Sequence, residues 1–247
     1  MLFRSSIIEA FVPVAGGSAT GTELATDAGI VLAGAPGTGK TALVRAMAGE
    51  SGVNLVTVHG PELFSQWLGE TEETLRTVFD RARNVAPSIL FFDQLDAIAP
   101  RQGGRGDDGA RAQRRVISQL TAELDALDQT SRVLVVAASN RLADVEPAIL
   151  RHGRLGVHIH LAAPSGEDRA GILHRHLRLA NLGEPAEALV AALVPMTAGL
   201  VGGDLEFVCQ SAVRAASAEQ RPISRADLLA AVENARANPI EGEPSGD

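Results

Sequence analysis

The chain has 247 residues, of which 45% are hydrophobic and 21% charged, with a formal net charge of −8. This balance excludes wholesale disorder, and the acidic excess disfavours nucleic acid as a partner. Since no apolar run approaches the roughly 20 residues of a membrane-spanning helix, we expect no membrane association. Because Cys209 is the only cysteine, no internal disulfide can form. We expect Cys209 to be a buried apolar thiol on a helix. The first residues also lack the pattern of a secretory signal. Together with the single cysteine, this lack favours a reducing, cytoplasmic location.

Apolar runs alternate with amphipathic helical patterns through the first two thirds of the chain. Continuous apolar runs are typical of parallel strands that are covered on both faces. The expected strands are Ile30–Ala33, Asn54–Val58, Ser88–Phe92, Arg132–Ala138 and Val157–Leu161. The expected helices are one that follows Lys40, one over about Thr71–Asn84, and one over about Ala110–Leu127. Strands alternating with helices predict an α/β domain with a parallel sheet over residues 29–164, after an unassigned segment 1–28.

After Pro164 only helical patterns follow. The expected helices run from Ser165 to about Leu179, after Pro185, from about Gly203, and after Ser224. Ser224 followed by Asp227 resembles a capping box, which marks a helix start. We therefore predict a small all-helical domain over residues 165–235 and a frayed tail over 236–247.

A phosphate-binding loop is the most specific motif. Residues 34–41, GAPGTGKT, fit G-x-x-x-x-G-K-[ST] between an expected strand and an expected helix. Glycines let backbone N–H groups converge on phosphate oxygens, and the helix N-terminus adds partial positive charge. Lys40, the only lysine in the chain, is expected to contact the β- and γ-phosphates, and Thr41 to hold Mg²⁺. The predicted nucleotide contacts are Pro36, Gly37, Thr38, Gly39, Lys40, Thr41 and Ala42; the alternative is a simple glycine-rich turn.

A carboxylate ends the buried strand pattern Ile89–Asp93. At the carboxyl end of a parallel strand, Asp93 is placed to hold Mg²⁺ through water, the Walker B role. The alternative is an aspartate that caps the following turn.

With these residues in view, the sequence resembles the AAA ATPases of the AAA+ superfamily, most closely their protein-remodelling branch, over about residues 29–236. The motifs that carry the resemblance are GAPGTGKT, Gly60–Leu63, FFDQLDAIAPR at 91–101, Ala138–Arg141, PAILRHGRL at 147–155, Ile172-Leu173 with His176, and Gly202–Asp204. The resemblance implies a P-loop NTPase sheet with flanking helices followed by a helical lid. It also implies ATP and Mg²⁺ as ligands, and ATP hydrolysis that is coupled to protein unfolding or complex remodelling. The implied assembly is a homo-oligomeric ring, a hexamer. This ring acts on a polypeptide substrate, with a possible adaptor protein.

The resemblance also assigns roles to single residues. Asn140 matches the sensor 1 position, which orients the attacking water. Arg151 and Arg154 match the arginines that reach the neighbouring subunit's ATP; the alternative is solvated surface charge. His176, Gly202 and Gly203 match the lining of the adenine pocket.

Gln66–Gly69 matches the first pore loop of the family, so Trp67 and Leu68 are expected to grip substrate in the ring channel. The alternative for Trp67, the only tryptophan, is ordinary core packing. Residues 101–111 are a candidate second pore loop.

Gln94 departs from the family, which has glutamate directly after the Walker B aspartate. Glutamine has the same size but cannot accept a proton, so the sequence predicts retained ATP binding and slowed hydrolysis. Gly156 likewise replaces a usual aspartate. Three other functions stay open: an ATP-loaded scaffold subunit that does not hydrolyse ATP, a nucleic-acid motor, and a small-molecule kinase.

Overall fold

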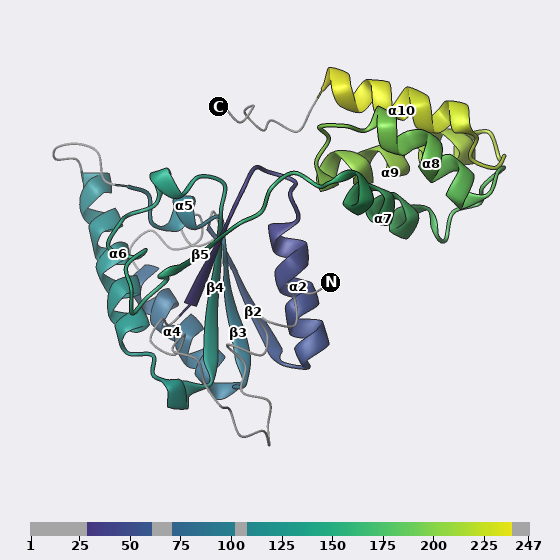
Figure 1. Ribbon diagram of the computed structural model, residues 1–247. Helices are drawn as coiled ribbons and strands as arrows, with labels where there is room; N and C mark the ends of the chain where they lie inside the picture. Colours follow the sequence, from purple (N-terminus) through teal and green to yellow (C-terminus); the bar gives the residue numbers. More distant parts are fainter. Residues whose placement is uncertain (1–28, 61–70, 102–107, 239–247) are drawn as a thin grey trace. The chain divides into compact units, whose positions relative to one another are not determined.

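The computed structural model describes residues 29–60, 71–101 and 108–238 (Figure 1). These residues form two compact units. One contains the residues up to Gly34 together with Lys40–His160, and the other contains Ala35–Gly39 together with the residues from Leu161 onward. Trp67 and Leu68 lie outside the described residues, as do the segment 1–28 and most of the candidate second pore loop. No described helix combines the length and the apolar character needed to cross a bilayer.

A five-stranded parallel sheet forms the centre of the first unit. Its strands are β1 (Gly29–Ala33), β2 (Asn54–His59), β3 (Ser88–Asp93), β4 (Val133–Ser139) and β5 (Val157–His160). They are arranged in the order β2-β3-β4-β1-β5, and every neighbouring pair is parallel. Each predicted strand is confirmed to within one residue at either end. The central strands β1, β3 and β4 are buried almost throughout, as continuous apolar runs predict, whereas the edge strands β2 and β5 include exposed positions.

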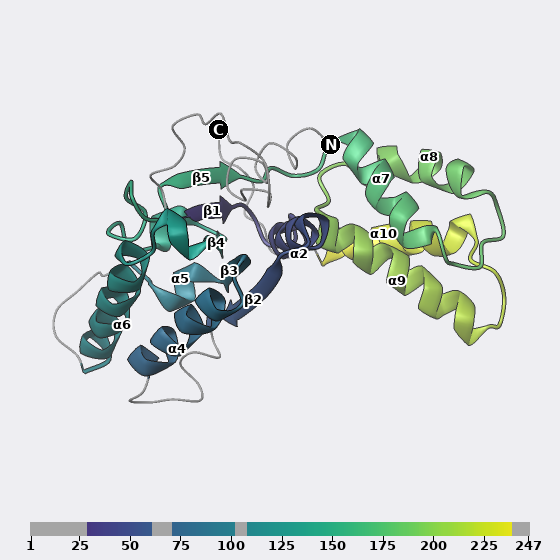
Figure 2. The same cartoon turned by 90° about the horizontal axis from the view of Figure 1, so that it is seen from below.

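Helices cover both faces of this sheet (Figure 2). They are α2 (Lys40–Ser51), α4 (Thr71–Asn84), α5 (Leu95–Ile98) and α6 (Asp108–Asp125), with 3₁₀ turns at Gln129–Ser131 and Leu142–Asp144. Helix α2 lies on one side of the sheet, and α4 and α6 lie together on the other. Phe79 of α4 packs on Phe92 of β3 with ring centroids 5.9 Å apart, and both side chains are fully buried. The predicted parallel α/β fold is therefore confirmed.

Four helices with a core of their own make up the second unit. They are α7 (Gly166–Leu177), α8 (Ala186–Met196), α9 (Gly202–Ala218) and α10 (Arg225–Ala237). The predicted capping box is present at α10, where Ser224 Oγ accepts from Asp227 N at 3.3 Å and Asp227 Oδ2 accepts from Ser224 N at 2.8 Å. Cys209 is buried in this core, as expected, and desolvation raises the pKa of its thiol to about 12.

Two helices, α7 and α6, have bounds that differ from those expected. Helix α7 ends at Leu177 rather than near Leu179, because the chain turns away to form an isolated bridge between Leu182 and Ile223. Helix α6 spans Asp108–Asp125 rather than about Ala110–Leu127, and α10 ends at Ala237.

Candidate nucleotide-binding site

The carboxyl ends of three adjacent strands carry the predicted polar residues of the first unit. Strand β1 leads into Gly34, β3 ends at Asp93, and β4 leads into Asn140. Because the sheet order places β3, β4 and β1 side by side, these positions lie along one edge of the sheet. In open α/β sheets this carboxyl edge is where ligands bind.

Lys40 connects two of these strand ends. Its Nζ donates to the carbonyl oxygen of Gly34 at 2.6 Å and to Asn140 Oδ1 at 2.9 Å, and the residue is only 9% exposed. Desolvation lowers the pKa of Lys40, and the carboxylates of Asp93 and Asp96 oppose that shift. Two neutral oxygens thus hold the ammonium group of Lys40 at the carboxyl edge of the sheet.

Thr41 and Asp93 form the second pair of the cluster. Thr41 Oγ1 donates to Asp93 Oδ2 at 3.1 Å. A hydroxyl and a carboxylate this close together are the hard oxygen donors that Mg²⁺ takes alongside phosphate and water, so the two residues fit the predicted metal. His59 is the neighbour that the sequence did not single out. It pairs with Asp93 in the β2–β3 register, and its Nδ1 lies 3.9 Å from Asp93 Oδ2.

Gln94 occupies a left-handed backbone conformation, with φ 61° and ψ 59°. Its carbonyl oxygen accepts from Ala97 N at 3.0 Å, which starts the short helix α5. The residue is exposed and directly follows Asp93 at the carboxyl edge. A non-glycine residue in this region of backbone space is uncommon, and it frequently marks a functional turn.

The rest of the phosphate loop, Ala35–Gly39, belongs to the helical unit. Gly37 and Gly39 have φ of 78° and 96°, which glycine adopts without strain. Within this unit the carbonyl oxygen of Gly37 accepts from Gly203 N at 3.0 Å. The loop therefore contacts one of the two glycines predicted at the adenine pocket, while His176 lies on α7 and is half-buried.

The two arginines that are predicted to reach the neighbouring subunit's ATP differ in their surroundings. Arg151 is exposed. Arg154 donates from Nε and Nη2 to the two oxygens of Asp125 and from Nη1 to the carbonyl oxygen of Ala148. The Asp125 carboxylate raises the pKa of Arg154, and Arg154 in turn lowers that of Asp125. Sequence reasoning missed Asp125, because 29 residues separate it from its partner.

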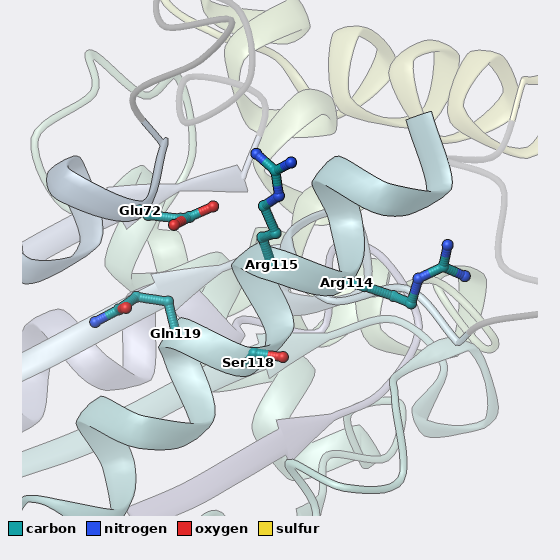
Figure 3. A pocket seen from close by; sticks show the side chains of 5 residues that line it. All are labelled: Glu72, Arg114, Arg115, Ser118 and Gln119. Carbon is teal, nitrogen blue, oxygen red and sulfur yellow. The ribbon is translucent and has the colours of Figure 1, made fainter. Parts of the chain in front are cut away.

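A pocket on the outer helices lies apart from the predicted site residues. Glu72 of α4 lines it together with four residues of α6, Arg114, Arg115, Ser118 and Gln119 (Figure 3). Charged, exposed side chains dominate it, so it lacks the apolar lining that small-molecule sites generally have.

Two comparisons with known proteins agree with this geometry. Residues 30–163 match the family described as "ATPase family associated with various cellular activities (AAA)". The chain is also 46% identical, over 184 residues, to a protein of Archaeoglobus fulgidus named "Cell division cycle protein 48 homolog". That match covers 74% of this chain but 25% of the relative, so the chain spans about a quarter of its length. A phosphate loop at the carboxyl edge of a parallel sheet, together with both matches, shows that the chain belongs to the AAA family of ATPases.

Proposed function

We propose that this chain binds ATP through Gly34–Thr41 and hydrolyses it slowly, as a subunit of a ring that remodels polypeptides. The observation that carries the proposal is the pair of contacts at the strand ends, Lys40 with Asn140 and Thr41 with Asp93. Together they place a cation, a hydroxyl, a carboxylate and an amide at the edge where α/β sheets bind ligands.

Each of these groups has a task in phosphoryl transfer. Lys40 neutralises charge on the β- and γ-phosphates, and the backbone N–H groups of Gly37–Ala42 hold the remaining phosphate oxygens, while Pro36, which has no N–H, shapes the loop. Thr41 and Asp93 would hold Mg²⁺, which supplies charge neutralisation and orientation of the phosphates when bound. The Asn140 amide exchanges its bond with Lys40 for one with the attacking water or with the γ-phosphate. His176, Gly202 and Gly203 contact the base.

Gln94 sets the rate in this proposal. Its amide can orient a water molecule by hydrogen bonding but cannot take the proton that the water loses on attack. A missing general base typically costs about 10²–10⁴-fold in rate. ATP and Mg²⁺ therefore stay bound longer than they would with glutamate at this position.

The ring supplies the catalytic arginines and the substrate channel. Arg151 and Arg154 act on the ATP of the neighbouring subunit, which makes hydrolysis depend on a homo-oligomer, a hexamer. Trp67 and Leu68 contact an extended polypeptide in the channel, and an adaptor protein can deliver that substrate. The family membership and the exposure of Arg151 support this part of the proposal.

A second function is favoured by Gln94 alone. A subunit that holds ATP without hydrolysing it stabilises a ring as a scaffold and performs no work. Single-turnover measurement at saturating ATP separates the two functions, because phosphate release above the uncatalysed background requires the slow enzyme and its absence favours the scaffold.

The nucleotide site itself is tested by titration calorimetry with ATP and Mg²⁺ on the wild-type chain and on Lys40→Ala. We expect binding by the wild type and at least a tenfold loss in the variant, since one charge-assisted contact contributes more than about 1.4 kcal/mol. Arg45→Ala is the matched control, because it removes an exposed cation from the same helix, α2, and should leave ATP binding unchanged. Equal binding by wild type and Lys40→Ala would refute the proposed site.

A further inference from the structure

Helix α9 begins without a capping side chain of its own. Its N-cap residue is Val201, whose hydrocarbon side chain cannot accept a hydrogen bond. The first N–H groups of a helix have no partner within the helix, and serine, threonine, aspartate or asparagine at the N-cap usually supplies one. Asp204 Oδ2 accepts from Val201 N, which lies outside the first turn. Helices α7 and α10, by contrast, each begin with a serine at the N-cap, Ser165 and Ser224.

The phosphate loop supplies the missing acceptor. Gly203 is the second residue of α9, and its N–H donates to the carbonyl oxygen of Gly37 at 3.0 Å. An N-cap side chain would normally accept from this N–H or from the next. Both segments belong to the same compact unit of the chain. The cap of α9 is therefore a backbone carbonyl from more than 160 residues earlier in the sequence.

Glycine at positions 37 and 202 favours this close approach. A Cβ added at Gly202 would lie 3.0 Å from the carbonyl oxygen of Gly37. A Cβ added at Gly37 would lie 2.8 Å from Val201 Cγ2, and its φ of 78° disfavours any side chain. Val201 also packs against the loop, so the contact consists of one hydrogen bond and one apolar contact.

The orientation of one peptide group links this cap to phosphate binding. In a trans peptide the C=O and the following N–H point in opposite directions. When Gly203 holds the carbonyl of Gly37, the N–H of Thr38 in the same peptide group faces away from α9. That N–H donates to the carbonyl oxygen of Ala35 at 3.4 Å, a long bond that a phosphate oxygen can replace.

We propose that Gly203 N–H is a positioning group for the phosphate loop: by holding the Gly37 carbonyl outward, it orients the Thr38 N–H for phosphate, and bound nucleotide in return strengthens the cap of α9. This inference rests on the proposed nucleotide binding. The reciprocity is a thermodynamic requirement, because each contact favours the same orientation of the Gly37–Thr38 peptide group. The size of a typical N-cap contribution corresponds to about a fivefold effect on either equilibrium.

Val201→Thr tests the proposal, because it adds an N-cap hydroxyl while keeping nearly the shape of valine. The hydroxyl competes with Gly37 for the first N–H groups of α9. Val201→Ala is the matched control, since it removes the methyl contacts without adding an acceptor. The readouts are backbone amide exchange at Gly203 and the affinity for ADP with Mg²⁺ by calorimetry, both on the full chain.

In the wild type and in Val201→Ala, we expect nucleotide to slow exchange at Gly203 by about fivefold. In Val201→Thr, we expect exchange at Gly203 to be slow already without nucleotide, and nucleotide to change it less than about twofold. The affinity of this variant for ADP should fall by up to about fivefold. If wild type binds ADP while exchange at Gly203 is unchanged, or if Val201→Thr behaves like Val201→Ala, the inference is overturned and the proposed function stands. If no ADP binds to the wild type, the proposed function fails and this inference fails with it.

Discussion

The guanidinium group of Arg154 donates to both carboxylate oxygens of Asp125, at 2.6 Å from Nε and 2.8 Å from Nη2. Its third nitrogen, Nη1, donates to the carbonyl oxygen of Ala148 at 2.6 Å. The pair thus joins the end of α6 to the turn that carries the exposed Arg151. The two arginines match one family motif, but within their own chain one is anchored and the other projects into solvent.

Removing the two arginines should therefore have different effects on stability. In a Gln94→Glu background, whose turnover is easier to measure, we expect Arg151→Ala to lower turnover by about 10³-fold with the melting temperature unchanged. We expect Arg154→Ala to lower turnover and also to cost about 1 kcal/mol of unfolding free energy, a modest value because Asp125 is half exposed. Turnover and thermal unfolding are compared with Arg175→Ala, an exposed arginine of α7. A monomer with full turnover would contradict action on a neighbouring subunit.

Glutamate in place of Gln94 should raise ATP turnover. We expect Gln94→Glu to increase it by about 10²–10⁴-fold, because a carboxylate can accept the proton of the attacking water. ATP affinity should change little, since the phosphate contacts are made by other residues. Steady-state phosphate release and calorimetry measure the two quantities. Gln94→Asn is the control, because asparagine tolerates the left-handed backbone and offers no base. Equal turnover in the wild type and Gln94→Glu would remove the role assigned to this position.

The Thr41 hydroxyl should determine how strongly Mg²⁺ improves ATP binding. Thr41→Val keeps the shape of the side chain but removes the donor to Asp93 Oδ2 and the oxygen offered to the ion. We expect the ratio of ATP affinities with and without Mg²⁺ to fall about tenfold, while binding without the metal stays nearly constant. Thr41→Ser retains the hydroxyl and should behave as the wild type. A ratio that is the same in all three proteins would exclude Thr41 as a metal ligand.

Acid should weaken the start of α10. Asp227 accepts from both Nη atoms of Arg221 and from the backbone N and Oγ of Ser224. These donors, Arg221 above all, hold the pKa of Asp227 well below its ordinary value. A carboxyl whose pKa is lowered by folding stabilises the folded state above its unfolded pKa, about 3.9, and loses this contribution as the pH falls toward the folded value.

The stability difference between the wild type and Asp227→Asn should therefore be constant above about pH 5 and shrink steadily below about pH 4. Urea unfolding between pH 2.5 and 7, followed by circular dichroism, measures it. Glu187→Gln on the exposed side of α8 is the control and should show no such trend. A difference that persists unchanged at pH 2.5 would show that the Asp227 carboxylate contributes nothing through its charge.

Local sequence signals predicted the elements well. The central strands β1, β3 and β4 were recognisable because a strand covered on both faces is almost entirely apolar. The helix starts at Ser165 and Ser224 were recognisable because a capping box needs only two polar residues, three positions apart. The phosphate loop was likewise readable, since its glycines, its lysine and its threonine are contiguous. Asp93 could be placed at the carboxyl edge from the end of its strand pattern alone.

The contacts of the site depend on which strands lie side by side, and no local pattern encodes that. Lys40 meets Asn140 one hundred residues later because β1 is inserted next to β4, and His59 meets Asp93 because β2 pairs in register with β3. The pairing of Asp125 with Arg154 could likewise not be predicted, because the two residues are 29 positions apart and meet only in the folded chain. Composition and periodicity thus determined the elements and the chemistry available at their ends, because both are properties of short segments. The partner of each polar group was determined by the order of the strands and by long-range packing, which the free energy of the whole fold selects.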